Sequence, residues 1–223
     1  MSRAPTQAPA PIGYFVAGTD TEIGKTHVCT ALVHELVRRG LRVAAMKPVA
    51  AGASPSLRNA DALALAAASN VAVPYETLNP FCLQPPISPH IAAKEAGIVI
   101  DPALIRAEFL EIRAVSDRVI VEGAGGWLAP ISDSKTMEDV AIALGLPVIL
   151  VVGLRLGCLN HALLTARSIR ASGLPFAHWI GNSIDPRFER AAENIATLTA
   201  ALGPPLTVVP HDGLPAWAAD ATL

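Results

Sequence analysis

The 223-residue sequence contains few aromatic residues, few charges and few cysteines. Aromatic side chains make up 4% of the chain and all hydrophobic residues 52%, so a folded core must consist mainly of aliphatic side chains and alanine. Charged residues make up 16%, and the formal net charge is −2. Because there is no basic excess to meet phosphate groups, neither nucleic acid nor an acidic membrane surface is an expected partner.

The three cysteines are odd in number and have no motif spacing, which argues against a disulfide framework or a zinc site. They are Cys29, Cys82 and Cys158, and each is expected to be a small buried apolar residue. A reducing compartment suits this composition, so we expect a cytoplasmic protein.

Long apolar runs are missing as well. The most apolar segment, residues 146–154, is interrupted by Gly153 and followed by Arg155. It is too short to span a bilayer and suits a strand buried on both faces. Residues 1–11 are rich in alanine and proline and lack the apolar region of a signal peptide, so we expect a disordered tail there.

Short apolar runs alternate with helical stretches along the chain, which predicts an α/β fold with a parallel sheet covered by helices on both faces. We expect strands at 12–17, 42–46, 118–121, 147–152, 176–180 and 206–209. We expect helices at 26–39, 58–69, from Pro102 onward with an apolar face that includes Leu104, and at 136–144, 159–171 and 187–202. Several prolines predict an extended loop over 75–90. No linker divides the chain, so residues 12–223 are expected to form one domain.

The segment Gly18–Thr26 reads GTDTEIGKT and lies between an expected strand and an expected helix. Such a loop turns successive backbone N–H groups inward and forms a cradle for phosphate oxygens. Gly24 allows close approach of the backbone, Lys25 carries a positive charge toward the β- and γ-phosphates, and the Thr26 hydroxyl can bind Mg²⁺. The sequence therefore predicts a site for a nucleoside triphosphate with magnesium.

The loop differs in one respect from the common phosphate-loop pattern. Its spacer is one residue longer, and Thr19 occupies the position of the first glycine. The strand–loop–helix context nevertheless matches. The neighbouring Asp20 is expected to be a solvated loop residue.

Three polar residues end expected strands and should lie near this loop, because parallel sheets gather their sites at the carboxyl ends of strands. They are Lys47, Glu122 and Asn182. Glu122 follows an apolar strand and precedes a glycine-rich turn, so its carboxylate is a candidate Mg²⁺ ligand. Asp61 is a second candidate, although an acid in the first turn of a helix is also favoured by the helix dipole.

Six motifs resemble those of the dethiobiotin synthetase family. They occur along the chain in the same order as in that family and cover nearly the whole chain. The long phosphate loop and the EGAGG turn at 122–126 are the most specific of them. The others are KPV at 47–49, RNADA at 58–62, SPH at 88–90 and LGCLNH at 156–161. The resemblance implies a fold of the P-loop NTPase type.

The resemblance also implies a reaction, in which 7,8-diaminononanoate, CO₂ and ATP give dethiobiotin, ADP and phosphate during biotin biosynthesis. One amine takes up CO₂ as a carbamate, ATP phosphorylates the carbamate oxygen, and the second amine attacks the mixed anhydride. The implied partners are the diamine, CO₂ or bicarbonate, and ATP with Mg²⁺. A second copy of the chain would form a homodimer with the substrate bound at its interface.

Carried over to this sequence, the resemblance implies four groups of site residues. The metal ligands would be Thr26, Asp61 and Glu122. The catalytic residues would be Lys25, Lys47 and Thr21. ATP would contact Glu22, Ile23, Gly24, Lys25, Thr26, His27, Glu122, Gly123, Ala124, Gly125, Asn182 at the adenine edge, Pro210, His211 and Asp212. The substrate would contact Lys47, Ala51 and, from the second subunit, Gly157, Cys158, Leu159 and Asn160.

One position departs from the family pattern. After KPVA the family usually carries serine or threonine, whereas this chain carries Ala51. The change removes a hydroxyl expected to meet the amine or carbamate of the substrate. Because a neutral hydrogen bond is worth about 0.5–1.5 kcal/mol, we expect weaker substrate binding or a water molecule in place of the hydroxyl, and not a different reaction.

Two other functions share this loop. A switch ATPase that positions partitioning or division machinery would carry a second lysine early in the loop, where this chain has Asp20, and often has a basic surface. An amidase-type ligase would need an additional glutaminase domain with a nucleophilic cysteine, for which this chain has no room. ATP turnover that requires both the diamine and bicarbonate separates these alternatives from the synthetase.

Overall fold

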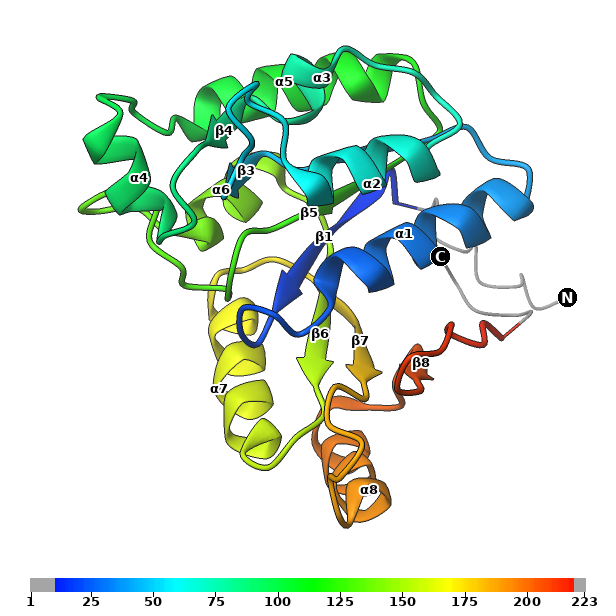
Figure 1. Ribbon diagram of the computed structural model, residues 1–223. Helices are drawn as coiled ribbons and strands as arrows, with labels where there is room; N and C mark the ends of the chain where they lie inside the picture. Colours follow the sequence, from blue (N-terminus) through cyan, green and yellow to red (C-terminus); the bar gives the residue numbers. More distant parts are fainter. Residues whose placement is uncertain (1–10, 219–223) are drawn as a thin grey trace, which may run out of the picture.

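The computed structural model describes residues 11–218, and its centre is a six-stranded parallel sheet (Figure 1). The strand order is β2-β5-β1-β6-β7-β8, so β1 lies in the middle between β5 and β6. The strands are β1 (Gly13–Gly18), β2 (Val43–Met46), β5 (Arg118–Glu122), β6 (Val148–Gly153), β7 (Phe176–Asn182) and β8 (Thr207–Val209). The parallel α/β architecture predicted from the sequence is confirmed. The expected tail, residues 1–11, lies outside the described residues except for Pro11.

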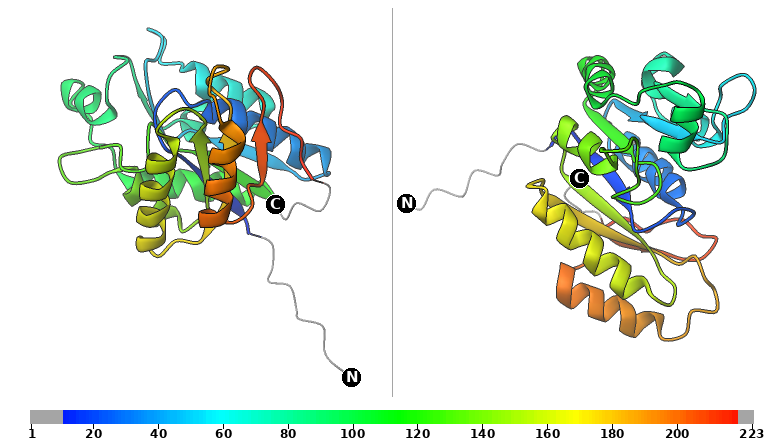
Figure 2. Two further views of the ribbon diagram at one scale, coloured as in Figure 1. Left: turned by 90° about the horizontal axis from the view of Figure 1, so that it is seen from below. Right: turned by 90° about the vertical axis from the view of Figure 1, so that its left-hand side faces the viewer.

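Helices cover both faces of this sheet. On one face lie α1 (Lys25–Arg38) and α2 (Ala60–Ala68). The opposite face is covered by α5 (Pro102–Ala114), α6 (Met137–Leu144), α7 (Cys158–Ala171) and α8 (Ala191–Leu202). Figure 2 shows α7 and α8 running side by side along the sheet. Within residues 11–218, no helix is long and apolar enough to cross a membrane.

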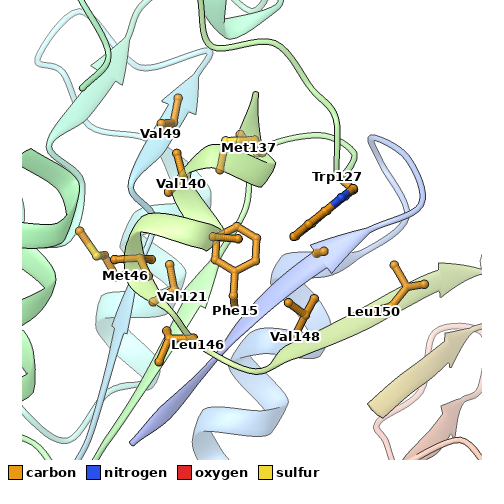
Figure 3. Close-up of a cluster of buried hydrophobic side chains, with 14 of the residues drawn as sticks. Phe15, Met46, Val49, Val121, Trp127, Met137, Val140, Leu146, Val148 and Leu150 are labelled. Carbon is orange, nitrogen blue, oxygen red and sulfur yellow. The ribbon is translucent and has the colours of Figure 1, made fainter. Parts of the chain in front are cut away.

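The central strand explains why the core divides into two clusters. Successive side chains of a strand point to opposite faces. Phe15 belongs to the cluster beneath α5 to α8, whereas its neighbours Tyr14 and Val16 belong to the cluster beneath α1 and α2. Figure 3 shows Phe15 among aliphatic side chains and beside Trp127, with ring centroids 6.2 Å apart in an edge-on arrangement.

The expectation of an extended loop over 75–90 was wrong in part. This segment contains the short helix α3 (Tyr75–Leu78) and the strand β4 (Phe81–Leu83), and it ends in the first residues of α4 (Pro89–Glu95). The strand pairs in parallel with β3 (Val49–Ala51) in a separate two-stranded sheet. Prolines do not prevent these elements, because they lie between them or at the first position of a helix, where no backbone donor is needed.

One helix boundary and one residue of an expected apolar face need correction. The last helix begins at Ala191 and not at Arg187, because Arg190 takes a left-handed conformation with φ of 58°. In α5, Ile105, Phe109 and Ile112 are buried as expected, but Leu104 is 45% exposed and does not belong to the apolar face.

Glu35 in α1 makes a buried charged contact that can be tested. Its carboxylate accepts hydrogen bonds from Arg38 and Arg39 at 2.8 Å, and its side chain is 5% exposed. Hydrogen bonding to Arg38 lowers the pKa of Glu35 to about 2, with burial opposing and Arg39 adding to the shift. A depressed pKa stabilises the fold above the unfolded-state pKa, and this stabilisation disappears as the pH falls toward 2.

We therefore expect Glu35→Gln to lower the free energy of unfolding at pH 7 by about 1–2 kcal/mol, a value reduced because Arg38 is largely exposed. The difference from wild type should shrink between pH 4.5 and 2. Urea denaturation across this pH range measures it. A difference that stays constant with pH would contradict the assignment.

Candidate functional site

The segment after β1 lies at the carboxyl edge of the sheet, between the ends of β5 and β6, where α/β proteins bind ligands (Figure 1). It leads into α1, whose N-cap is Gly24 and whose N-terminus is capped by no side chain. Free N–H groups at a helix N-terminus, together with the helix dipole, form an anion site. The geometry therefore suits the phosphate binding predicted from the sequence.

Two residues in the loop have left-handed backbones. Gly24 has φ of 78°, and a Cβ placed on it would lie 2.3 Å from Asn182 Nδ2. Only glycine fits there, because any side chain would both strain the backbone and collide with this amide. Glu22 also has a positive φ, 57°, which is uncommon for a residue with a side chain and is typical of strained functional loops.

Lys25 is 7% exposed, and its Nζ donates to the backbone carbonyl of Asp20 at 2.8 Å. Burial and, to a smaller extent, the nearby Lys47 lower the pKa of Lys25 to about 8, while Glu122 opposes the shift. The ammonium is therefore held against the loop carbonyl, next to the N–H groups that begin α1.

A second lysine and two carboxylates meet beside the loop. Lys47 Nζ donates to Glu122 Oε1 and, at 3.2 Å, to Asp61 Oδ2. The Thr26 hydroxyl donates to the same Glu122 oxygen at 2.8 Å. Burial lowers the pKa of Lys47, but Glu122 and Asp61 outweigh it, so the pKa lies above its ordinary value. The structure thus brings together Thr26, Lys47, Asp61 and Glu122, as the motif order predicted.

The oxygen atoms of Thr26, Asp61 and Glu122 are suitable ligands for Mg²⁺, which prefers hard oxygen donors. Glu122 is 1% exposed, and its Oε2 has no hydrogen-bond partner in the described chain. A buried carboxylate oxygen without a partner is costly, and a cation would satisfy it. These residues therefore fit a magnesium ion.

Cys29 lies on α1 beneath this cluster and is completely buried. Burial and the nearby Glu122 raise the pKa of the Cys29 thiol well above its ordinary value, so it stays protonated. The expectation of a small buried apolar residue is confirmed for Cys29 and for Cys158, whereas Cys82 is only partly buried.

Three cavities adjoin one another along this edge. The phosphate-loop cavity, about 390 Å³, is lined by Thr21, Glu22, Gly24, Lys25, Thr26, Lys47, Asp61, Glu122 and Gly125. The Pro210 cavity, about 300 Å³, shares Glu22 and Gly24 with it. The Ala51 cavity, about 490 Å³, shares Thr21, Lys47 and Asp61 with it. A long ligand, or two ligands end to end, can therefore occupy one continuous site.

The Pro210 cavity is also lined by His27, Asn182, Pro210, His211 and Asp212, all of them expected ATP contacts. Asn182 is 7% exposed, and its amide nitrogen donates to the carbonyl of Ile23 at 2.7 Å. The imidazole of His27 meets the Gly213 carbonyl at 2.8 Å. These contacts hold Asn182 against the phosphate loop and Gly213 against the start of α1.

Ala51, where the family usually has a hydroxyl, lines the Ala51 cavity together with Lys47, which also lines the phosphate-loop cavity. It is lined by Ala51 and Asn59, by the turn residue Ala124, and by the segment 86–89. The Asn59 side chain donates to the Ala51 carbonyl at 3.1 Å and caps α2, which carries Asp61. Gly123 and Ile23 line none of the three cavities; they pack beneath the site, Gly123 against Phe15 and Ile23 in the core.

Residues 157–160 line none of the three cavities within this chain. Gly157 is the N-cap of α7 with φ of 94°, Cys158 is buried, Leu159 is partly buried and Asn160 is exposed. The segment before α7 is tied to the phosphate loop, because Arg155 forms an ion pair with Asp20 at 2.5 Å. Asp20 was expected to be a solvated loop residue. Its side chain is half-exposed and is paired with Arg155.

Several lining residues were not predicted from the sequence. Ser183 and Ile184 follow Asn182 into the Pro210 cavity, and Pro86, Ile87, Ala129 and Pro130 line the Ala51 cavity. Nothing in their type or spacing signals a site. Ser88 also lines the Ala51 cavity, and its position in the SPH motif was the one available signal.

Solved structures share this fold at low sequence identity. The signal recognition particle receptor FtsY of Thermotoga maritima matches with a TM-score of 0.58 and 17% identity, over 95% of this chain and 66% of that receptor. The septum site-determining protein MinD of Pyrococcus horikoshii, solved with Mg-ADP, matches with a TM-score of 0.52 and 17% identity, over 90% of this chain and 82% of MinD. These similarities establish the P-loop NTPase type of fold and nothing about activity.

Sequence comparison is more specific. A protein-family profile described as "AAA domain" matches residues 13–212. The protein named ATP-dependent dethiobiotin synthetase BioD in Aromatoleum aromaticum is 53% identical over 205 residues, which cover 90% of this chain and 91% of that protein. The protein of the same name in Nitrosospira multiformis is 51% identical over 90% of this chain and 88% of its own length. With such identity over nearly its whole length, the chain belongs to the ATP-dependent dethiobiotin synthetase family.

Proposed function

We propose that this protein forms dethiobiotin from 7,8-diaminononanoate, CO₂ and ATP, releasing ADP and phosphate. The observation that carries the proposal is the meeting of Lys25, Lys47, Asp61 and Glu122 at one rim of the sheet. Two lysines and two carboxylates around a phosphate loop suit a phosphoryl transfer in which positioning and charge stabilisation supply most of the catalysis. The family membership supports the same reaction.

The nucleotide would lie along two of the cavities. Its phosphates would meet the N–H groups at the start of α1, with Lys25 on the transferred phosphoryl group and Thr21 and Glu22 beside it. Its base would enter the Pro210 cavity, where Asn182, His211 and Asp212 line the walls. Thr26, Asp61 and Glu122 would hold Mg²⁺, which would neutralise the charge of the β- and γ-phosphates.

The diamine would occupy the Ala51 cavity, on the other side of Lys47. One amine nitrogen forms a bond to the carbon of CO₂ and loses a proton, which gives a carbamate. A carbamate oxygen then attacks the γ-phosphorus, and ADP leaves. The second amine attacks the carbamate carbon, phosphate leaves, and the cyclic urea closes. Lys47 would hold the carbamate oxygen next to the γ-phosphate, because it lines both cavities.

A second copy of the chain would complete the site. Gly157, Cys158, Leu159 and Asn160 lie at the start of α7 and line none of the three cavities described above, which suits a role toward the partner's substrate. The free N–H groups of this helix start favour a carboxylate such as that of the diamine substrate. Residues 12–223 would act as one domain in each subunit of this homodimer.

The direct test is an assay for dethiobiotin with the purified protein. We expect product, ADP and phosphate in equal amounts, and only when the diamine, bicarbonate, ATP and Mg²⁺ are all present. ATP turnover that needs no diamine and rises with DNA, lipid or glutamine would instead support a switch ATPase or an amidase-type ligase. In that case the proposal would be wrong.

Ala51 provides a test of how the substrate is bound. We expect Ala51→Ser to lower the KM for the diamine by about two- to tenfold, because a hydroxyl in this cavity gains one neutral hydrogen bond. The KM for ATP should not change, since Ala51 lines only the cavity beyond Lys47. Titration of the diamine at saturating ATP measures the difference, and Ala51→Val is the control that adds bulk without a hydroxyl. Equal Michaelis constants for wild type and the serine variant would refute this interpretation.

A further inference from the structure

Lys47 lies at the point where the proposed function would put a metal ion. Its ammonium contacts Glu122 Oε1 and, at 3.2 Å, Asp61 Oδ2. The Thr26 hydroxyl contacts the same Glu122 oxygen at 2.8 Å. One oxygen of each carboxylate and the Thr26 hydroxyl are therefore already engaged with an internal cation or with each other, whereas Glu122 Oε2 has no partner among the described residues.

The other buried lysine of the site does not share this position. Lys25 is as buried as Lys47, but its Nζ is bonded to the Asp20 carbonyl and forms no ion pair with Glu122 or Asp61 among the described residues. Without a bound metal, Lys47 is therefore the residue that mainly neutralises the two carboxylates. A divalent cation bound by these carboxylates at about 2.0–2.1 Å would lie next to the Lys47 ammonium, which contacts both of them, and would repel it.

We propose that Lys47 competes with the divalent cation for this site. Its ammonium neutralises Glu122 and Asp61 while the site is empty, and it leaves them when the cation binds. The inference rests on the proposed function for the identity of the metal ligands. Because of this competition, the protein should bind the metal only weakly when no nucleotide is present.

The exchange has a consequence for catalysis. A metal that arrives with ATP brings the negative charge of the phosphates, which compensates both the metal and the displaced ammonium. Lys47 also lines the Ala51 cavity, about 490 Å³, so the released ammonium has space on the side where a carbamate would lie. Loading of the metal and nucleotide would thereby turn Lys47 toward the substrate.

The test measures binding of Mn²⁺ alone to the nucleotide-free protein by electron paramagnetic resonance. Lys47→Met should raise the affinity for Mn²⁺ by about tenfold or more, because the internal competitor is gone. Lys25→Met is the matched control, since it removes an equally buried positive charge that forms no ion pair with the carboxylates among the described residues. It should change the affinity by less than about threefold. Equal effects of the two variants, or weaker binding to Lys47→Met, would overturn the exchange.

A second measurement needs no variant and so does not depend on one folding. The sequence has four lysines, of which Lys94 and Lys135 are exposed and serve as internal references. Acetylation followed by mass spectrometry should label Lys47 slowly in the metal-free wild type. Addition of Mn²⁺ alone should raise that rate severalfold and leave the two references unchanged. A constant rate for Lys47 under saturating Mn²⁺ would overturn the inference.

The dethiobiotin assay on the same wild-type preparation separates this inference from the proposed function. Product formation together with an unchanged Lys47 labelling rate would overturn the exchange alone. A metal-dependent rise in labelling without any product would overturn the reaction and support the exchange.

Discussion

Lys47→Met should lower the rate of dethiobiotin formation by about 10²–10³-fold, the effect typical of losing one buried charged or hydrogen-bonding group at a reacting centre. The side chain is 5% exposed and lines both the phosphate-loop and Ala51 cavities, so water cannot easily replace its charge. The fold should survive, because methionine has a similar length and a bound metal ion can compensate the remaining Glu122 carboxylate.

The measurement is single-turnover and steady-state formation of dethiobiotin at saturating ATP and diamine. The loss should fall mainly on kcat, since a contact made in the transition state affects the chemical step more than binding. Lys94→Met on exposed α4 is the control and should keep full activity. If Lys47→Met retained more than about a tenth of the wild-type rate, its proposed role at the carbamate would be wrong.

Glu122→Gln should have the largest effect on stability. Removing one partner of a buried ion pair leaves the other charge uncompensated and typically costs about 3–5 kcal/mol. Glu122 is 1% exposed and contacts both Lys47 and Thr26, whereas the remaining carboxylate, Asp61, is 49% exposed and farther from Lys47. The amide cannot neutralise the ammonium, so the free energy of unfolding should fall by about 3 kcal/mol or more.

Urea denaturation of the nucleotide-free protein measures this loss. The control is Asp61→Asn, which should cost less than about 1 kcal/mol because a half-exposed ion pair contributes little. The double variant Lys47→Met/Glu122→Gln should be more stable than Glu122→Gln alone, since no buried charge then lacks a partner. A double variant that loses the sum of the two single effects would contradict the pairing.

Local patterns were sufficient to predict most of the fold. The stripe Val28, Leu32 and Leu36 identified α1, and all three side chains are fully buried. The aspartate–proline start of α5 was also predicted correctly, as Asp101 accepts the Ala103 N–H at 2.9 Å. The strand β4 was missed because three residues among prolines carry no periodicity. Its existence depends on pairing with β3, about thirty residues earlier in the chain, and such tertiary pairing leaves no local signal.

The sequence also predicted which residues meet at the site, but not the contacts between their side chains. The order of the motifs, and the rule that parallel strands place their ends together, brought Lys47 and Glu122 to the phosphate loop. Sequence could not predict that Lys47 bridges two carboxylates, that Arg155 pairs with Asp20, or that residues 86–89 line the substrate side. These contacts depend on side-chain directions across elements that are distant in sequence, and residue type alone does not determine them.

The hydrogen bond from Asn182 to the Ile23 carbonyl determines how this side chain can meet a nucleobase. A carbonyl accepts only from a donor, so the amide nitrogen must face Ile23 and the amide oxygen is the atom left for a ligand. That oxygen can accept from the exocyclic amino group of adenine, whereas the keto group of guanine would bring two acceptors face to face. In the proposed complex, the backbone of the phosphate loop would thus also orient the group that meets the base, and one peptide carbonyl would link affinity for the triphosphate with discrimination between purines.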